Sequence, residues 1–180
     1  MMEQARAIVE FWKQAGPERW FARDADFDAR FGELFLDQHL AASRREYEEW
    51  LCTGEGVLGL MLLLDQFPRN VFRGSAHSYA TDPLARHYAM RAIEEGMDLR
   101  LEAQLRPFVY LPFEHSEDPV DQERSVAMFQ ALGDPSSLEY ALIHRDVIQR
   151  FGRFPHRNAA LGRIPTVAEL EYLANGGFSA

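Results

Sequence analysis

The stretch GVLGLMLLLDQFPRN, residues 56–70, contains the longest apolar run of the chain and then becomes polar abruptly. Its first nine residues are apolar or glycine, a pattern that favours a helix buried on all sides. The run is too short to cross a membrane, because a membrane-spanning helix needs about 20 apolar residues. We therefore expect a buried core helix in this part of the chain.

The polar end of this stretch predicts a helix end and an ion pair. Pro68 cannot continue a helix and disfavours the α conformation at Phe67, so the helix is expected to stop here. Asp65 then falls in the last turn, where the negative end of the helix dipole makes a carboxylate unfavourable. A neighbouring cation relieves this cost, and Arg69, with Arg73 as the alternative, is the expected partner.

A second Phe-Pro motif, FPHRN at 154–158, follows another apolar helical stretch and lies in a basic segment. Its arginines have two interpretations. They hydrogen-bond the carbonyls of helix ends and pair with buried acids, or their guanidinium groups converge on a bound carboxylate or phosphate. We interpret both motifs as helix ends that direct Arg and Asn toward one polar centre. The predicted ligand-binding residues are Asp65, Arg69, Asn70, Arg153, His156, Arg157 and Asn158.

Composition and charge restrict the class of protein. The 180 residues are 47% hydrophobic and 26% charged, which is typical of a soluble globular protein. A net charge of −9 argues against a nucleic-acid or anionic-membrane partner, because such partners favour basic surfaces. The single cysteine, Cys52, cannot form an intrachain disulfide, and the N-terminal segment has no secretory pattern. The expected location is the cytoplasm.

Signals for helix starts and ends recur throughout the chain. Asp118 precedes a proline as an N-cap would, the TVAE sequence at 166–169 fits a capping box, and Gly133 and Gly152 stand where helix C-caps are expected. Asp82 also precedes a proline and is expected to be an N-cap. No segment alternates as a strand does. The sequence predicts an all-α fold of eight or nine helices in a single domain, residues 1–180.

A third polar cluster lies in YLPFEHSEDPVDQER, residues 110–124. Glu114 and His115 follow an apolar turn, and His144 lies on an apolar helical stripe. A carboxylate beside a histidine can form an acid–base pair or supply metal ligands, so these three are the catalytic candidates. The alternative for His144 is a core residue with a satisfied hydrogen bond. The spacing matches no metal motif and no cofactor fingerprint, so no metal site is predicted and any cofactor is unknown.

Four segments together resemble one bacterial family: EFWKQAGPERWFARDADFDARF (10–31), LLLDQFPRNVFRG (62–74), YLPFEHSEDPVDQERSVAMF (110–129) and RFGRFPHRNAALGR (150–163). This is the domain-of-unknown-function family 924. The resemblance implies a tetratricopeptide-like, right-handed array of helix pairs and supplies no reaction. The chain lacks the repeating tetratricopeptide consensus, so the implied likeness concerns helix packing and not peptide binding.

Three hypotheses for function follow from these observations. The first is a site for a small anionic ligand, catalytic or sensory, in which arginines bind the anion and His and Glu handle protons. The second is a helical scaffold that binds a protein or peptide. The third is a purely structural polar core. A ligand site predicts a concave pocket with partly paired arginines, whereas a structural core predicts complete pairing. Whether the protein is an enzyme, and its oligomeric state, do not follow from the sequence.

Overall fold

A computed structural model describes residues 2–179, and most of these residues are helical with none in a strand. The eight helices of eight or more residues are α1 (Met2–Ala15), α3 (Ala25–Ser43), α4 (Gly54–Met61), α6 (Asp82–Glu94), α7 (Pro107–Glu114), α8 (Pro119–Leu132), α9 (Pro135–Phe151) and α10 (Val167–Ala174). The all-α prediction is confirmed. The tetratricopeptide-like handedness stays a prediction.

Short elements connect these helices. Two are single α-turns, α2 (Pro17–Trp20) and α5 (Phe67–Val71), and one is a π-helix, η2 (Leu62–Gln66). The others are 3₁₀ turns: η1 (Glu48–Cys52), η3 (Ala76–Tyr79), η4 (Asp98–Arg100), η5 (Ala103–Leu105) and η6 (Pro155–Arg157).

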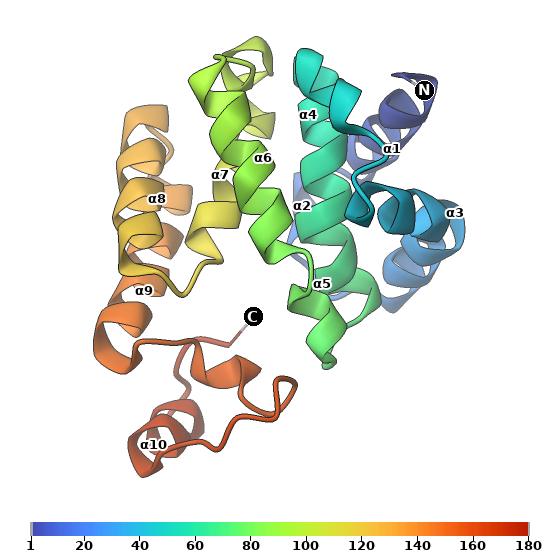
Figure 1. The fold of residues 1–180 in the computed structure, drawn as a ribbon. Coiled ribbons are helices and arrows are strands. Elements are labelled where there is room, and N and C mark those ends of the chain that lie inside the picture. The colour runs from blue at the N-terminus through green and yellow to red at the C-terminus, as the bar shows by residue number, and fades with distance from the viewer. Residues whose placement is uncertain (1, 180) are drawn as a thin grey trace. The chain divides into compact units, whose positions relative to one another are not determined.

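The chain forms two compact units (Figure 1). The first contains residues 2–73 and 77–112, and the second contains residues 113–179 with 74–76. The boundary falls inside α7, whose last two residues belong to the second unit. The single-domain organisation stays a prediction.

Helix α4 is the centre of the first unit, as its sequence predicts. It packs against α1 and α6, and in Figure 1 these two helices flank it. All of its residues except Glu55 are buried. Gly59 faces α1, where a Cβ built on it would make an ordinary van der Waals contact of 3.4 Å with the Cβ of Ala5. Stacked and edge-to-face rings extend this core, among them Phe11, Trp12, Phe27, Phe31 and Phe108.

The first Phe-Pro motif does not end the buried helix, and this corrects the prediction from the sequence. The helix continues from α4 through the π-turn η2 and Pro68, and it ends at Val71. Phe67 keeps α backbone angles (φ −53°, ψ −52°), and its N–H donates to the carbonyl of Leu62, five residues back. The wider π-turn accommodates the proline that would break a regular α-helix.

Side chains satisfy the carbonyls that the π-turn and Pro68 leave without a helical donor. Nδ1 of His39 donates to the carbonyl of Leu63 (2.8 Å), which fixes the proton on that ring nitrogen because a carbonyl can only accept. The hydroxyl of Thr81 donates to the carbonyl of Leu64 (2.5 Å). Buried carbonyls need such partners, so these two contacts explain how the helix passes through Pro68.

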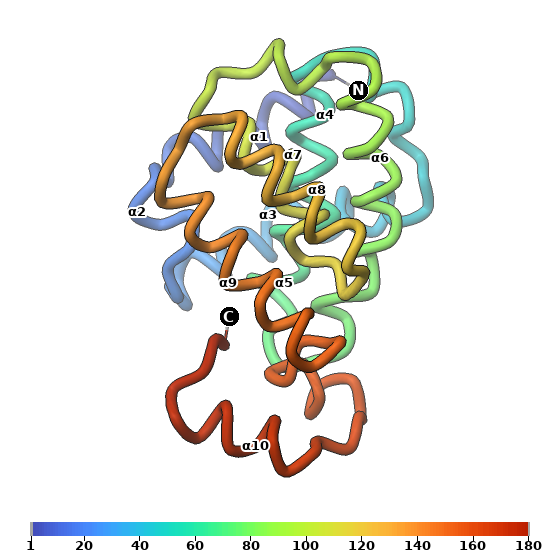
Figure 2. The backbone as a smooth tube through the Cα atoms, turned by 90° about the vertical axis from the view of Figure 1, so that its left-hand side faces the viewer, coloured from blue at the N-terminus to red at the C-terminus, as the bar shows by residue number. Residues whose placement is uncertain are grey.

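The second unit is built on the α8–α9 helix hairpin, whose two helices lie side by side in Figure 2. Asp118 and Asp134 cap the two N-termini, and Gly133 and Gly152 adopt the left-handed conformation at the two C-termini, as predicted for Asp118 and for both glycines. Helix α9 therefore ends at Gly152, before Phe154-Pro155, which instead begins η6. Val147, Ile148 and Phe154 form a buried apolar cluster here.

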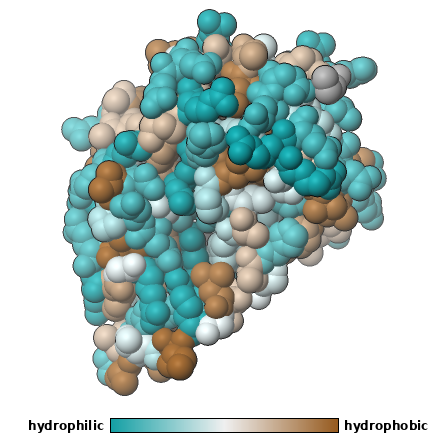
Figure 3. Space-filling view, viewed as in Figure 1, coloured by the Kyte–Doolittle hydropathy of each residue, from teal (hydrophilic) through white to brown (hydrophobic). Residues whose placement is uncertain are grey.

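On the face drawn in Figure 3, hydrophilic side chains predominate and hydrophobic ones are scattered. Within residues 2–179, none of the helices combines the length and the apolar character that a membrane crossing requires.

Candidate functional site

Arg69 joins two buried carboxylates in the first unit. Its Nη1 lies 3.1 Å from Oδ1 of Asp65, and its two terminal nitrogens donate to the two carboxylate oxygens of Asp82 at 2.8 and 3.0 Å. The predicted Asp65–Arg69 pair is therefore confirmed. Asp82 is not the predicted N-cap: helix α6 begins at Asp82 itself, after Thr81, and the Asp82 carboxylate binds Arg69 instead.

The remaining polar groups of this motif also have partners inside the first unit. Gln66 donates from Nε2 to Oδ2 of Asp65 (2.7 Å), and Arg69 Nη1 donates to the carbonyl of Asp65 (2.9 Å). The Oδ1 atom of Asn70 accepts from Arg73 (3.3 Å). The Asp65 motif is thus an internally paired polar cluster, which is the arrangement expected of a structural core.

The second and third motifs meet inside the second unit. Glu117 accepts from Arg163 at both carboxylate oxygens (2.7 and 3.0 Å), and its Oε1 also accepts from the backbone N–H of Phe154 (2.8 Å). Burial raises the pKa of Glu117, but these donors outweigh it and hold the pKa below its ordinary value. Glu117 therefore connects the segment that follows α7 to the second Phe-Pro motif through hydrogen bonds.

Glu114, His115 and His144 lie together in the second unit. Oε1 of Glu114 is 3.3 Å from Nδ1 of His144, and the rings of His115 and His144 are 6.1 Å apart. Glu114 and His144 are buried, and His115 is partly exposed. The three candidates drawn from sequence positions 114–144 thus form one cluster, as predicted.

The backbone around Glu114 and His115 is held by buried donors. Nε2 of Gln122 donates to the carbonyls of Glu114 (2.6 Å) and Ser116 (2.7 Å), and Nη2 of Arg157 donates to the carbonyl of His115 (2.9 Å). These carbonyls follow the end of a helix and have no helical donors. Gln122 and Arg157 therefore fix the positions from which the Glu114 and His115 side chains project.

Burial keeps His144 neutral near pH 7. Its Nδ1 donates to the carbonyl of Tyr140 (2.8 Å), so this nitrogen carries the proton. Burial, assisted by the positive potential of His115, Arg157 and His156, lowers the pKa of His144 to about 3. A histidine with this pKa is a poor proton donor near pH 7, because efficient acid–base groups titrate near the working pH.

The other predicted binding residues of the second motif have separate contacts. Arg153 pairs through two nitrogens with Glu169 (2.6 and 2.8 Å), and this hydrogen bonding holds the pKa of Glu169 well below its ordinary value. Asn158 accepts from Arg163 (2.9 Å). The ring of His156 contacts the rings of Phe154 and Phe178, with ring centres 5.6 and 5.5 Å apart. Arg153 therefore contacts Glu169 and not the Glu114 cluster.

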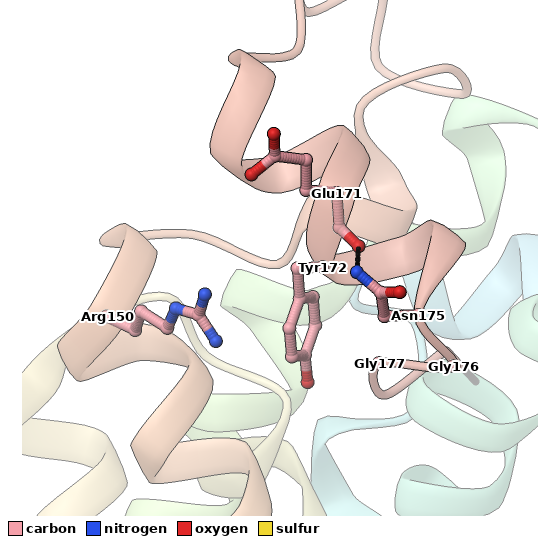
Figure 4. A pocket seen from close by; sticks show the side chains of 6 residues that line it. All are labelled: Arg150, Glu171, Tyr172, Asn175, Gly176 and Gly177. Atoms are coloured by element: carbon pink, nitrogen blue, oxygen red, sulfur yellow. Dashed lines mark hydrogen bonds between the residues drawn. The ribbon is translucent and has the colours of Figure 1, made fainter.

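An open cavity of about 260 Å³ lies beside the C-terminal helix of the second unit. Its lining residues, drawn in Figure 4, are Arg150, Glu171, Tyr172, Asn175, Gly176 and Gly177. The guanidinium of Arg150 points toward Tyr172 and lies 5.3 Å from the centre of that ring and 4.7 Å from the ring of Phe151. Within residues 2–179, Arg150 forms no ion pair or hydrogen bond through its side chain.

Several residues that complete these polar contacts are not among the site residues predicted from the sequence. They are Asp82, Gln122, Arg163 and Glu169. The basic segment at 150–157 contains Arg150, but the predicted ligand-binding arginines in it are Arg153 and Arg157, which lie nearest to Phe154-Pro155. Asp65, Arg69 and Asn70 belong to the first unit, so the idea that all three motifs share one polar centre stays a prediction.

The fold and the sites define an all-helical protein with one internally paired Arg–Asp cluster and one Glu–His cluster. The sequence matches, over residues 8–177, the family described as bacterial protein of unknown function (DUF924), and the chain belongs to this family. A solved structure of a protein of unknown function from Agrobacterium tumefaciens is similar, with 52% identity, a TM-score of 0.95, and coverage of 97% of this chain and 99% of that chain. None of the curated proteins compared with the chain matches it.

Proposed function

We propose that the chain binds a small anionic ligand in the cavity beside Arg150. The observation that carries the proposal is the difference between Arg150 and the other arginines of these motifs. Arg69, Arg153 and Arg163 each donate through two nitrogens to a carboxylate of the protein. Arg150 lies beside an open cavity and forms no ion pair within the described residues.

The lining of the cavity restricts the ligand. A guanidinium binds carboxylates and phosphates through parallel N–H donors, and that of Arg150 lies over the rings of Tyr172 and Phe151. Glu171 lines the same cavity, so its negative charge opposes a ligand of high charge. A volume of about 260 Å³ lies below the usual range for drug-sized ligands, which restricts the ligand to a few heavy atoms. These features together favour a small monocarboxylate over phosphate.

Nuclear magnetic resonance titration tests this proposal. The probes are acetate and inorganic phosphate, added to the full chain with ¹⁵N-labelled backbone. We expect acetate to shift the amide signals of Tyr172, Gly176 and Gly177, and Arg150→Gln to weaken this binding at least fivefold. Arg30→Gln is the matched control, because Arg30 is an exposed arginine of the first unit and its loss changes the net charge equally.

Two results contradict the proposal. One is the absence of shifts at the cavity residues at high acetate concentration. The other is equal acetate binding by the wild type and Arg150→Gln. Stronger binding of phosphate than of acetate, removed by Arg150→Gln, would retain the anion site and change the ligand class.

Protein binding is the second candidate function, and a separate observation favours it. Ile164, Val167 and Leu170 are 87%, 72% and 53% exposed, and they follow one another at three-residue intervals in the second unit. Val167 and Leu170 stand three residues apart on α10 and so lie on one side of that helix, and Ile164 precedes it. Exposed apolar side chains that form one patch mark interaction sites. Sedimentation analysis of wild type and Ile164→Asp tests self-association through these residues. A dimer lost in the variant supports this function, and monomers in both exclude self-association.

We also propose a cytoplasmic location, because a single cysteine, Cys52, is typical of a protein in a reducing compartment.

A further inference from the structure

The Glu114, His115 and His144 cluster brings three potential metal ligands together. One ligand atom from each residue lies within 4.8 Å of the ligand atoms of the other two. Glu114 and His115 stand at the end of α7, and His144 is in the middle of α9. The sequence predicted no metal site because it shows no short ligand spacing. A site assembled from two separate helices has no such spacing to detect.

The distances allow one ion to contact all three groups. For three atoms separated by no more than 4.8 Å, some point lies within about 2.8 Å of each of them. Zinc–nitrogen and zinc–carboxylate distances are about 2.0–2.2 Å, so side-chain adjustments below about 1 Å complete the contacts. Rotation about side-chain bonds supplies movements of this size without changing the helices.

Neighbouring contacts prepare the cluster for an ion. Gln122 and Arg157 hold the carbonyls of Glu114 and His115, which restricts the positions of these two ligands. Nδ1 of His144 lies 2.8 Å from the carbonyl of Tyr140 and 3.3 Å from Oε1 of Glu114, so the lone pair that an ion would take is the one on Nε2. Metal-binding histidines commonly donate their other ring N–H to a carbonyl in this way, because the contact fixes the ring and its tautomer.

We propose that Glu114, His115 and His144 bind a divalent first-row transition metal ion such as Zn²⁺. Two imidazoles and one carboxylate are a donor set that such ions favour, whereas Ca²⁺ and Mg²⁺ favour oxygen ligands alone. Three protein ligands leave a coordination position open, as in sites that bind a further ligand. Arg157 beside His115 carries a positive charge that opposes the ion and attracts an anion to that open position.

The proposed metal site is separate from the proposed anion cavity beside Arg150. Its test does not depend on that cavity, because Zn²⁺ is titrated without acetate or phosphate. The full chain is first stripped of metal by a chelator and then titrated with ZnCl₂ in competition with a chromophoric chelator. We expect one Zn²⁺ per chain with a dissociation constant below about 10 μM. Co²⁺ in place of Zn²⁺ should give visible absorption bands of a nitrogen-ligated ion.

Variants test whether these three residues are the ligands. His115→Asn is the main variant, because His115 is partly exposed and its loss should not prevent folding. It should weaken Zn²⁺ binding at least tenfold, and Glu114→Gln should do the same where circular dichroism shows a folded chain. His87→Asn, an exposed histidine, is the matched control and should bind as wild type.

A pair of histidines in the first unit is the rival site. Nε2 of His39 and Nε2 of His77 lie 3.4 Å apart, so His77→Asn is included as a further variant. Binding that survives His77→Asn and is lost in His115→Asn supports the proposal. No Zn²⁺ binding by wild type, or equal binding by wild type and His115→Asn, would overturn it.

Discussion

Arg69 donates to both carboxylate oxygens of Asp82, at 2.8 and 3.0 Å, across thirteen positions of sequence. The same guanidinium lies 3.1 Å from Asp65, so one cation pairs with two buried carboxylates. This arrangement explains why an acidic residue is tolerated beside the most apolar run of the chain. A buried charge is stable only where it is paired and hydrogen-bonded.

Removing Asp82 should therefore destabilise the first unit strongly. We expect Asp82→Ala to lower the free energy of unfolding by about 3–5 kcal/mol, because it removes one partner of a buried ion pair and leaves Nη2 of Arg69 without its carboxylate acceptor. Urea unfolding followed by tryptophan fluorescence measures this change, since Trp12, Trp20 and Trp50 all belong to the first unit.

Asp28→Ala is the matched control for Asp82→Ala. Asp28 also accepts from two nitrogens of one arginine, Arg73, but that pair is more exposed. Its loss should cost about 1 kcal/mol or less, as for surface pairs. Similar losses in free energy of unfolding in the two variants would show that the Arg69–Asp82 pair stabilises the fold no more than an exposed pair does.

A second prediction concerns the carbonyl of Leu64, where the buried helix continues through Pro68. The hydroxyl of Thr81 satisfies the carbonyl of Leu64, which in a regular helix would accept from residue 68. Thr81→Val should cost about 1–3 kcal/mol, because it leaves that buried carbonyl without a donor.

Pro68→Ala offers a direct test of this explanation. Alanine restores an N–H at position 68, which can donate to the carbonyls of the preceding turn. Thr81→Val should therefore cost less in the Pro68→Ala background than in the wild type. Additive effects of the two substitutions in a double-mutant cycle would show that Thr81 and Pro68 are not coupled through this carbonyl.

Local signals in the sequence were sufficient for the helix ends of the second unit. Asp118 caps α8, Gly133 and Gly152 end α8 and α9, and Thr166 forms the complete capping box of α10. Each of these depends on contacts within about four residues, which a sequence pattern records. The all-α fold followed from such signals and from the absence of strand alternation.

Long-range partners could not be predicted in the same way. Pro68 indicated a helix end because its effect on the preceding turn is local, but His39 and Thr81, distant in sequence, donate to the carbonyls involved. Asp82 looked like an N-cap because the cap position and the first helical position differ by a single residue. The contact between Glu114 and His144 joins residues thirty positions apart, so its geometry depends on tertiary packing that a local pattern does not record.

The buried state of His144 predicts a specific dependence of stability on pH. The folded pKa of about 3 lies below the ordinary value of 6.5, so the unfolded chain binds a proton in this window and the folded chain does not. The contribution of His144 to stability is therefore complete above pH 6.5 and is lost progressively as the pH falls toward 3. The expected slope is about 1.4 kcal/mol per pH unit within the window.

Comparison of His144→Asn with wild type isolates this slope. Unfolding is measured between pH 7 and 4 with a chelator present, so that no metal competes with the proton. The wild type should lose stability faster than His144→Asn as the pH falls, and His87→Asn, an exposed control, should follow the wild type. Parallel curves for wild type and His144→Asn would mean that His144 titrates normally in the folded chain.

A further prediction concerns Gln122, because its single buried amide donates to more than one carbonyl. Its Nε2 donates to the carbonyls of Glu114 and Ser116, and the side chain is completely buried. Gln122→Met keeps the length and removes the donors, so it should cost about 1–3 kcal/mol. Gln122→Glu should cost more at pH 7, because a carboxylate would face carbonyl oxygens, and this excess should shrink at low pH as the introduced carboxyl is protonated.

The Gln122 variants also test whether the chain is one domain. Gln122 lies in the second unit, whereas all three tryptophans lie in the first. If residues 1–180 unfold as one cooperative domain, tryptophan fluorescence and far-ultraviolet circular dichroism will give the same transition, and Gln122→Met will shift both equally. If the units unfold independently, Gln122→Met will leave the fluorescence transition at its wild-type position and shift only part of the dichroism signal. We expect the coincident shift, because the predicted fold is a single helical domain.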